Sequence, residues 1–492
     1  MKYIIVGGGP SGLSLAHGLI QGGHDVDIIE KNTQLGGSWN SQWIEQKYWS
    51  ENSPRILIYG SPNLKSFLND IGINKEHVSV VYGNYMQLLF KTMRTSLTYL
   101  NFFDIIKITS KITSEKLTSD KHTTVQDWLD KSTLSKDGKK YIKMTSILLN
   151  DRPDKTNLKD YINAISGFLP SAVPYQFKDP NDWHRKIENN IKNISSSNVY
   201  KNTEVVSLIE NNNRVTGIIM KDLNTNKITI NDAERVILCC QPTGILNILQ
   251  MSNDKIKNNW KDFKSMKHWC DNTYYSGFGF QLQFDEIVEF PSFWCWSCAG
   301  DWNVIILPVS NWLDNPSKDN KIKTVWSCCI VDMDTKSKRL NKTANECTKS
   351  EVLNECLNQI NEVHKIPKPY RITFSVGLKH YLGKWQSMNV GFTRNKLGFL
   401  PMKGTIDNLF ALGCFTETKN SIVAHMGGAV DASAKFLNEY EPSIESFHNK
   451  SSMINMLINI LIFFIILVIV TFLIRKKYIN PLNLSSKINL VD

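Results

Sequence analysis

The sequence lacks several features that would assign it to a specialised class of protein. Among its 10 cysteines, only Cys295 and Cys298 form a CxxC pair, and a zinc ribbon would need a second pair. The net charge is +11, but no compact arginine-rich stripe and no nucleic-acid-binding motif accompanies it. We therefore expect unpaired thiols in a reducing compartment, no metal centre and no nucleic-acid partner. The lysine excess reflects composition or an attraction to anionic membranes.

The composition is that of a globular protein of more than one domain. Of the 492 residues, 42% are hydrophobic and 21% are charged, which is typical of folded chains rather than disordered ones. A chain of this length exceeds one ordinary hydrophobic core. No internal repeat or low-complexity linker interrupts it. We expect at least two domains.

One long uncharged run lies near the carboxyl end. Residues 453–474 contain no charge, and Arg475, Lys476 and Lys477 follow at once. As a helix, this run would extend about 33 Å, which is enough to span a bilayer. The amino terminus lacks the cleavage region of a signal peptide, so we expect a tail-anchored membrane protein with its body on the cytosolic side. The basic cluster after the span favours the opposite orientation under the positive-inside rule.

A glycine motif for binding a dinucleotide opens the chain. The apolar run 3–6 predicts a buried parallel strand, GGGPSG follows it, and residues 13–23 predict a helix. A second strand over 26–30 ends in an acid. GxGxxG spacing allows a tight turn, close approach of a pyrophosphate and close helix–strand packing, while the acid can bind a ribose diol. The residues expected to contact the dinucleotide are Gly7, Gly9, Pro10, Ser11, Gly12, Glu30 and Lys31.

After Glu30, the sequence resembles the flavin amine oxidase superfamily, which includes monoamine and polyamine oxidases and protoporphyrinogen oxidase. In that family, an acid ending the second strand and a following Gly-Gly pair wrap the adenosine and diphosphate of FAD. Gly36, Gly37 and Ser38 match this arm, with Ser38 in place of the usual arginine. Pro54-Arg55 resembles the family's "gPR" element. The resemblance implies an FAD-dependent oxidoreductase.

Two further blocks are similar to the same family. In residues 199–249, two strands precede an apolar strand and a helix, and the resemblance implies that the backbone of Val205 and Val206 holds the adenine edge. In the family, a late helix faces the flavin pyrimidine ring. Its free N–H groups and dipole would stabilise the charge that reduction leaves on the N1–C2=O edge. The match to this last motif runs through Thr416, Glu417, Thr418, Met426, Gly428, Ala429 and Val430.

Together the blocks predict an α/β fold whose first domain is discontinuous. A Rossmann-like FAD-binding domain would combine residues 1–85, 190–265 and 400–440. A substrate domain of α+β type with a mixed sheet would combine residues 86–189 and 266–399. A linker over 441–452, a transmembrane helix over 453–474 and a short basic tail over 475–492 would complete the chain.

The resemblance also implies a reaction. Family members transfer a hydride from an amine or similar substrate to flavin N5, and oxygen reoxidises the flavin. They commonly hold a lysine beside the strand that enters the substrate sheet, here 276–284, but no lysine lies there, and Lys264 and Lys267 come too early. Weak candidates for the substrate site are Lys379, Tyr381 and Trp385, although ordinary packing accounts for each singly. The catalytic residues stay unassigned.

Two alternatives remain open. GGSW at residues 36–39 is also similar to flavin monooxygenases and NAD(P)H-dependent reductases, but these normally carry a second GxGxxG and none follows residue 40. The missing lysine favours a non-catalytic, FAD-binding membrane scaffold. The substrate is not identified by the sequence. A membrane span favours a lipophilic small molecule, or it serves only as an address.

Overall fold

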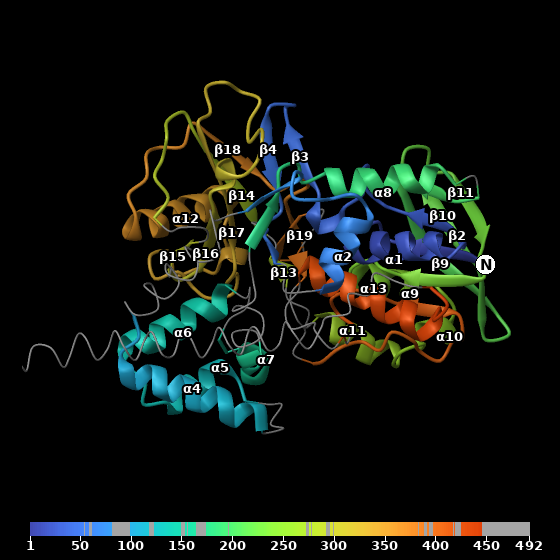
Figure 1. Ribbon diagram of the computed structural model, residues 1–492, viewed down its shortest axis with the longest axis horizontal. Coiled ribbons are helices and arrows are strands. Elements are labelled where there is room, and N and C mark those ends of the chain that lie inside the picture. The colour runs from blue at the N-terminus through green and yellow to red at the C-terminus, as the bar shows by residue number, and fades with distance from the viewer. Residues whose placement is uncertain are drawn as a thin grey trace, which may run out of the picture. The chain divides into compact units, whose positions relative to one another are not determined.

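The fold is described from a computed structural model of the chain (Figure 1). The membrane span expected at 453–474 and the basic tail at 475–492 lie outside the residues that the structure describes. Within those residues, no helix is both long enough and apolar enough to cross a bilayer. The described residues are 1–53, 55–58, 62–80, 99–117, 123–148, 153–154, 156–163, 174–194, 196–271, 275–276, 278–291, 296–298, 300–381, 383–387, 391–392, 397–416, 418 and 425–444.

A five-stranded parallel sheet organises the first half of the fold. Its strand order is β22-β12-β1-β2-β8, and every neighbouring pair runs parallel. Segments distant in the sequence thus become neighbours in one sheet. The strands are β1 (Lys2–Val6), β2 (Asp25–Ile29), β8 (Asn198–Tyr200), β12 (Arg235–Leu238) and β22 (Leu409–Ala411).

Alternate side chains of the parallel strands enter two hydrophobic cores, one on each face of the sheet. Tyr3 and Ile5 of β1 belong to one core, and Ile4 and Val6 belong to the other. This is the period of two that a strand buried on both faces requires. The first core is covered by the helices α1 (Pro10–Gln21), α2 (Pro62–Asp70), α8 (Asp182–Lys192) and α13 (Met426–Tyr440).

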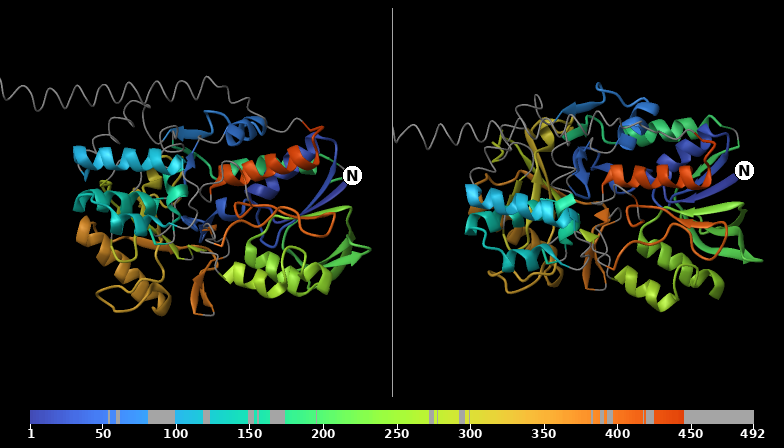
Figure 2. Two further views of the ribbon diagram at one scale, coloured as in Figure 1. Left: turned by 90° about the horizontal axis from the view of Figure 1, so that it is seen from below. Right: turned by 60° about the horizontal axis from the view of Figure 1, so that its bottom comes forward.

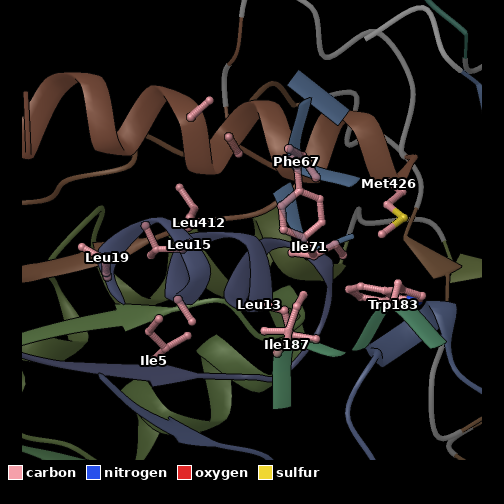
Figure 3. Packing of buried hydrophobic residues seen from close by; sticks show 14 of the residues in the cluster. Ile5, Leu13, Leu15, Leu19, Phe67, Ile71, Trp183, Ile187, Leu412 and Met426 are labelled. Atoms are coloured by element: carbon pink, nitrogen blue, oxygen red, sulfur yellow. The ribbon is translucent and has the colours of Figure 1, made fainter. Parts of the chain in front are cut away.

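The helices of the first core interlock closely. In Figure 3, Leu13, Leu15 and Leu19 of α1 lie beneath α13, and Met426 at the start of α13 lies above Trp183. Two serines join the helices, since Ser433 Oγ lies 2.8 Å from Ser14 Oγ. The small residues of α1 allow the approach: a Cβ on Gly18 would lie 2.5 Å from Leu437 Cδ1.

The second core lies between the parallel sheet and a meander followed by short helices. The meander has the order β11-β10-β9, and helices follow β12 along the chain. These elements are β9 (Thr203–Asn211), β10 (Arg214–Asp222), β11 (Ile228–Asp232), α9 (Pro242–Gln250), α10 (Asp254–Lys257) and α11 (Phe263–Asp271).

The second half of the fold is built on an antiparallel sheet of order β15-β16-β17-β14-β18. The sequence predicts a mixed sheet here, and this is wrong, because all four pairings are antiparallel. Aromatic and aliphatic side chains fill the core between this sheet and α12. The elements are β14 (Gly279–Phe284), β15 (Trp296–Cys298), β16 (Val304–Leu307), β17 (Thr324–Ile330), β18 (Arg371–Phe374) and α12 (Lys349–Val363).

A group of four helices has a small core of its own. Figure 2 shows it as a cyan and teal group, separate from the helices that cover the parallel sheet. Val125, Leu129, Tyr161 and Ile162 are among the buried residues of this core. The helices are α4 (Phe102–Leu117), α5 (Val125–Lys131), α6 (Lys136–Leu148) and α7 (Leu158–Asn163).

The boundary expected at residue 190 lies too late. Phe177 of β7 (Pro174–Phe177) and Trp183 of α8 pack into the first core, so residues 174–192 belong with the parallel sheet. β7 is the central strand of a small antiparallel sheet whose outer strands are β5 (Leu57–Ile58) and β6 (Val78–Val80). Three short two-stranded units complete the fold: β3 (Ser41–Ile44) with β4 (Tyr48–Glu51), β13 (Tyr275–Ser276) with β21 (Gly391–Phe392), and β19 (Lys379–Tyr381) with β20 (Lys384–Gln386).

Candidate functional site

The carboxyl ends of the parallel strands meet at one edge of the sheet. Gly7 follows β1, Glu30 follows β2 and Cys239 follows β12. Backbone hydrogen bonds hold this edge together: the N–H of Gly7 donates to Ile29 O at 2.8 Å, and that of Cys239 donates to Val6 O at 2.8 Å. Ligands of open parallel sheets bind in the crevice outside this edge.

At two positions of the first motif, a side chain would clash with neighbouring backbone atoms. Gly7 has φ +110°, which side chains disfavour, and a Cβ there would lie 3.0 Å from the backbone of Cys239. A Cβ on Gly12 would overlap the carbonyl oxygen of Gly7, so α1 can approach the turn only with glycine. These are the roles that the motif predicts.

The third glycine, Gly9, faces open space. Among the described residues, a Cβ on Gly9 would come within 4 Å of one atom, the Cα of Gly37, at an ordinary contact distance of 3.8 Å. Gly9 caps α1, and Pro10 takes the first helical position, where a missing N–H costs nothing. Ser11 follows, and its carbonyl accepts a hydrogen bond from Ser433 Oγ at 2.8 Å. An anion can therefore approach the positive end of α1 over Gly9.

Glu30 is buried at the end of β2. Its Oε2 accepts from the N–H of Gly8 at 2.7 Å, and its Oε1 accepts from the N–H of Asn32 at 2.8 Å. Burial raises the pKa of the carboxyl above its ordinary value, and the two backbone donors oppose that rise. The carboxylate is thus fixed beside the glycine turn, with further lone pairs that a ribose diol can use.

The second glycine pair folds back onto the first. Gly36 and Gly37 have φ +103° and +55°, and the N–H of Gly36 donates to Gly8 O at 2.8 Å. A Cβ on Gly37 would lie 2.8 Å from Gly9 Cα. Only glycine therefore fits where the two turns touch. The arm formed by residues 36–41 closes one side of the open space over Gly9.

A buried ion pair holds this arm. Arg55 Nη1 donates to Ser38 O at 2.9 Å, and its Nε and Nη2 donate to Glu51 Oε2 at 3.0 and 2.7 Å. Both side chains are almost fully buried. The guanidinium also lies 5.7 Å from the ring centre of Trp39. Ser38 therefore contributes its backbone to the arm, while Arg55 supplies a guanidinium close by.

The expected adenine-side residues lie on the edge strand β9. Ser207 pairs with Ile219 and Val205 pairs with Met220, so Val206 is the extra residue of a β-bulge. A bulge leaves the polar backbone groups of its extra residue outside the ladder. β9 begins beside the sheet edge, since the N–H of Thr203 donates to Glu30 O at 3.0 Å. Lys31 points outward and pairs with Glu204 at 2.7 Å.

The helix that carries Gly428 of the last motif is α13, and His425 caps its amino-terminal end. His425 Nδ1 accepts from the N–H of Gly428 at 3.2 Å, so that N–H is not free, contrary to the expectation for this helix start. Burial lowers the pKa of His425 to about 4, so the ring stays neutral and keeps its acceptor at neutral pH. Met426 is buried in the first core, and Thr416 Oγ1 donates to Gly413 O at 2.7 Å within its own turn. Glu417 lies outside the described residues.

The weak substrate-site candidates do not form a cage. Trp385 is buried in the core of the antiparallel sheet, and its Nε1 donates to Cys347 O at 3.2 Å. Lys379 and Tyr381 are exposed on the β19–β20 hairpin. Lys264 and Lys267 lie exposed on α11, and Lys267 pairs with Asp271 at 2.7 Å. Ordinary packing therefore accounts for Trp385.

A second support for the arm has no recognisable signal in the sequence. Asn181, which precedes α8, forms hydrogen bonds to Ser41. The N–H and Oγ of Ser41 donate to Asn181 Oδ1 at 3.1 and 3.2 Å. Asn181 Nδ2 donates back to Ser41 O at 2.9 Å. His184, one turn on, lies under the arm, since a Cβ on Gly36 would be 2.7 Å from its Cδ2. Asparagine before the helix start resembles an ordinary cap in sequence, which hides its longer-range contact.

Comparisons with known proteins agree with this geometry. A family model described as an NAD(P)-binding Rossmann-like domain matches residues 5–71. No curated protein sequence matches. An oxidoreductase from Methanosarcina mazei matches with a TM-score of 0.60 at 15% identity, covering 89% of this chain and 100% of that one. A putrescine oxidase matches with a TM-score of 0.60 at 12% identity, covering 90% and 99%.

A cyclohexylamine oxidase from Brevibacterium oxydans IH-35A matches with a TM-score of 0.54 at 12% identity, covering 89% of this chain and 99% of that one. The chain shares the overall fold of these oxidoreductases. Within this fold, the crevice outside the parallel sheet is the candidate cofactor site.

The residues at this crevice fit an FAD. The space over Gly9 is open to a diphosphate, and a Cβ at Gly37 would crowd it. Glu30 offers a fixed carboxylate at the ribose position. Asn40, at the end of the arm, is buried with neither of its side-chain polar atoms bonded within the described part of the chain. A ligand with polar edges would complete such a set.

Proposed function

We propose that this protein is an FAD-dependent oxidoreductase of the amine oxidase type. Its substrate would be an amine or a similar compound that loses a hydride from carbon, and oxygen would take up the electrons. The carrying observation is the glycine arm at residues 36–41, folded over the open space at Gly9. When bound, FAD would supply the redox chemistry through its N5 position.

The chain's own residues would bind and orient that cofactor. Glu30 would accept hydrogen bonds from a ribose diol, and the start of α1 would hold the diphosphate. The bulge at Val206 would offer backbone groups to the adenine edge. The start of α13 would place the partial positive charge of its helix near the ring edge that gains charge on reduction.

The antiparallel sheet would exclude water from the reacting face. Every residue of β14 is buried, and the carbonyl of Asn52 packs against Gly279. Removing water strengthens electrostatic interactions in such a site. β14 holds no lysine, which leaves open a non-catalytic, FAD-binding scaffold as a second candidate function.

An NAD(P)H-dependent reductase is a third candidate, since the matching family model is described as NAD(P)-binding. The single GxGxxG of the chain favours one dinucleotide rather than two. The three candidates differ in what reduces the flavin.

The test is anaerobic reduction of the FAD-loaded protein, followed by its visible spectrum. Putrescine, cyclohexylamine and a wider amine panel are added in one series, and NADPH in another. Bleaching by an amine, with recovery of the spectrum on admitting oxygen, supports the amine oxidase function. Bleaching by NADPH alone supports the reductase. No bleaching in either series contradicts both and favours the scaffold.

We further propose that residues 453–474 anchor the protein in a membrane, with the body on the cytosolic side. The uncharged run supports the membrane anchor, whereas the basic residues after it favour the opposite orientation of the body. Partition of the full chain and of a chain ending at residue 444 between detergent-rich and aqueous phases tests it. We expect only the full chain to enter the detergent phase, and equal partition of both would contradict the anchor. A lipophilic small-molecule substrate would be consistent with this attachment.

A further inference from the structure

Two buried asparagines at the open end of the β3–β4 hairpin carry side-chain amide atoms with no hydrogen-bond partner in the described part of the chain. Asn40 is 3% exposed and Asn52 is 5% exposed. Within the described residues, neither Nδ2 nor Oδ1 of Asn40 has a hydrogen-bond partner, and Nδ2 of Asn52 has none. Buried polar side chains are nearly always bonded, because an unpaired amide in the interior is destabilising. These amide atoms can therefore form hydrogen bonds to a bound ligand.

Asn40 and Asn52 flank the last residue pair of the hairpin. Ser41 pairs with Glu51, and continuing this antiparallel register sets Asn40 opposite Asn52. Residues directly opposite in such a pair share one face. Glu51 belongs to the other face, where it bonds to Arg55. The unpartnered atoms of Asn40 and Asn52 thus lie at the same end of the hairpin.

This group lies between the cofactor crevice and the antiparallel sheet. On one side, the N–H of Asn40 donates to Gly37 O at 3.2 Å, and a Cβ on Gly36 would lie 3.3 Å from Asn40 Cβ. On the other side, Asn52 Oδ1 accepts from Ser387 Oγ at 2.9 Å, and the Asn52 backbone packs against Gly279. In Figure 1 the hairpin stands between β14 and α8, which lie in the two halves of the fold.

We propose that Asn40 and Asn52 form a ligand subsite for a planar lactam or imide edge. Two side-chain N–H₂ groups can donate to carbonyl oxygens, and Asn40 Oδ1 can accept from an N–H between or beside them. The inference rests on the proposed function, because it assumes a dinucleotide over Gly9. The flavin pyrimidine edge has this chemistry, and so does an amide-bearing substrate.

The test compares Asn40→Leu and Asn52→Leu with the unaltered full chain in detergent. Leucine has nearly the shape of asparagine, and in Asn40→Leu it removes the two unpartnered atoms, so we expect the unfolding midpoint of that apoprotein to stay equal or rise. Asn52→Leu also removes the acceptor of the Ser387 hydrogen bond, so its midpoint should fall slightly. If the flavin supplies the edge, the dissociation constant for FAD rises about tenfold in each variant.

If a substrate supplies the edge, FAD binding stays unchanged in the variants. The dissociation constant of benzamide, followed by the visible difference spectrum of the FAD-loaded protein, then rises about tenfold instead. Either result supports the subsite and identifies the source of its ligand.

Asn408→Leu is the matched control. Asn408 is buried and fully bonded: its Nδ2 donates to Val215 O at 2.7 Å and to Glu234 O at 2.8 Å, and its Oδ1 accepts from the N–H of Val215 at 2.8 Å. This variant should unfold earlier and bind FAD normally. The subsite is overturned if Asn40→Leu and Asn52→Leu bind both FAD and benzamide normally, or if Asn40→Leu unfolds as early as the control. If the unaltered chain fails to bind FAD, the proposed function itself fails.

Discussion

The parallel sheet brings glycines and polar residues to one edge, whereas the antiparallel sheet buries nearly every side chain that it carries. Gly7, Gly9 and Glu30 lie together at the carboxyl ends of the parallel strands. Hydrogen bonds from Gly7 to Ile29 and from Gly8 to Glu30 hold this edge together. In the antiparallel sheet, β14 and β17 are buried throughout. Under the proposed function, the first region would hold the cofactor through its backbone and the second would shield it from water. Substitutions in the two regions should therefore have different effects on stability and on flavin binding.

The largest effect is expected at the ion pair that joins the regions. Arg55→Met should lower the free energy of unfolding by about 3–5 kcal/mol, because the buried Glu51 carboxylate loses its counter-charge. Urea denaturation measures this. The double change Glu51→Leu with Arg55→Met should recover most of the loss. A single-variant cost below about 1 kcal/mol, as for an exposed pair, would show that the ion pair does not hold the arm.

A smaller loss is expected at the tight contact of the parallel region. Gly12→Ala should lower the free energy of unfolding by about 1–3 kcal/mol, since its methyl group would overlap the carbonyl of Gly7. Thermal unfolding of the apoprotein tests this. An unchanged midpoint would mean that α1 does not press against the turn.

Acid should weaken the parallel region through its histidines. Burial lowers the pKa values of His17, His184 and His425 to about 4, below the ordinary value of 6.5. Because the folded state holds these rings neutral, their stabilising effect is complete above pH 6.5 and is lost as the pH falls toward 4. Each should cost on the order of 1 kcal/mol per pH unit within that window.

His425→Asn tests this dependence at one position. Asparagine can still cap α13, so stability at pH 7 should change little, while the slope between pH 6.5 and 4 should become shallower. Urea midpoints across this range give the slope. An unchanged slope would show that His425 does not contribute to the loss of stability in acid.

The smallest effect is expected in the antiparallel region. Tyr381→Ala should change the free energy of unfolding by less than about 0.5 kcal/mol, because the side chain is 53% exposed on a hairpin. Flavin reduction by an active substrate should also be unchanged. A marked loss of the rate of flavin reduction would show that Tyr381 takes part in substrate binding.

The cofactor edge was predictable because local patterns determine it. The positions of Gly7, Gly12 and Glu30 follow from a strand, a turn and a helix within the first 30 residues. The importance of Gly36 and Gly37 came from the family resemblance, and the structure shows that both have positive φ.

Contacts between distant segments were not predictable in the same way. Arg55 was noted as part of a motif, but its partners Glu51 and Ser38 appear only when the hairpin and the arm are brought together. The boundary at residue 190 was wrong because β7 and α8 join the first core through packing that no local signal marks. The mixed sheet was wrong because alternation indicates a strand without its direction.

The most direct test of the central claim is titration of FAD into the apoprotein and into Gly9→Ala. The account predicts that the unaltered protein binds FAD with a shifted flavin spectrum. Gly9→Ala should unfold at nearly the same midpoint but bind far more weakly, since its methyl group would occupy only the open space. A folded protein that takes up no FAD, or a Gly9→Ala variant that binds as well as the unaltered chain, would contradict it.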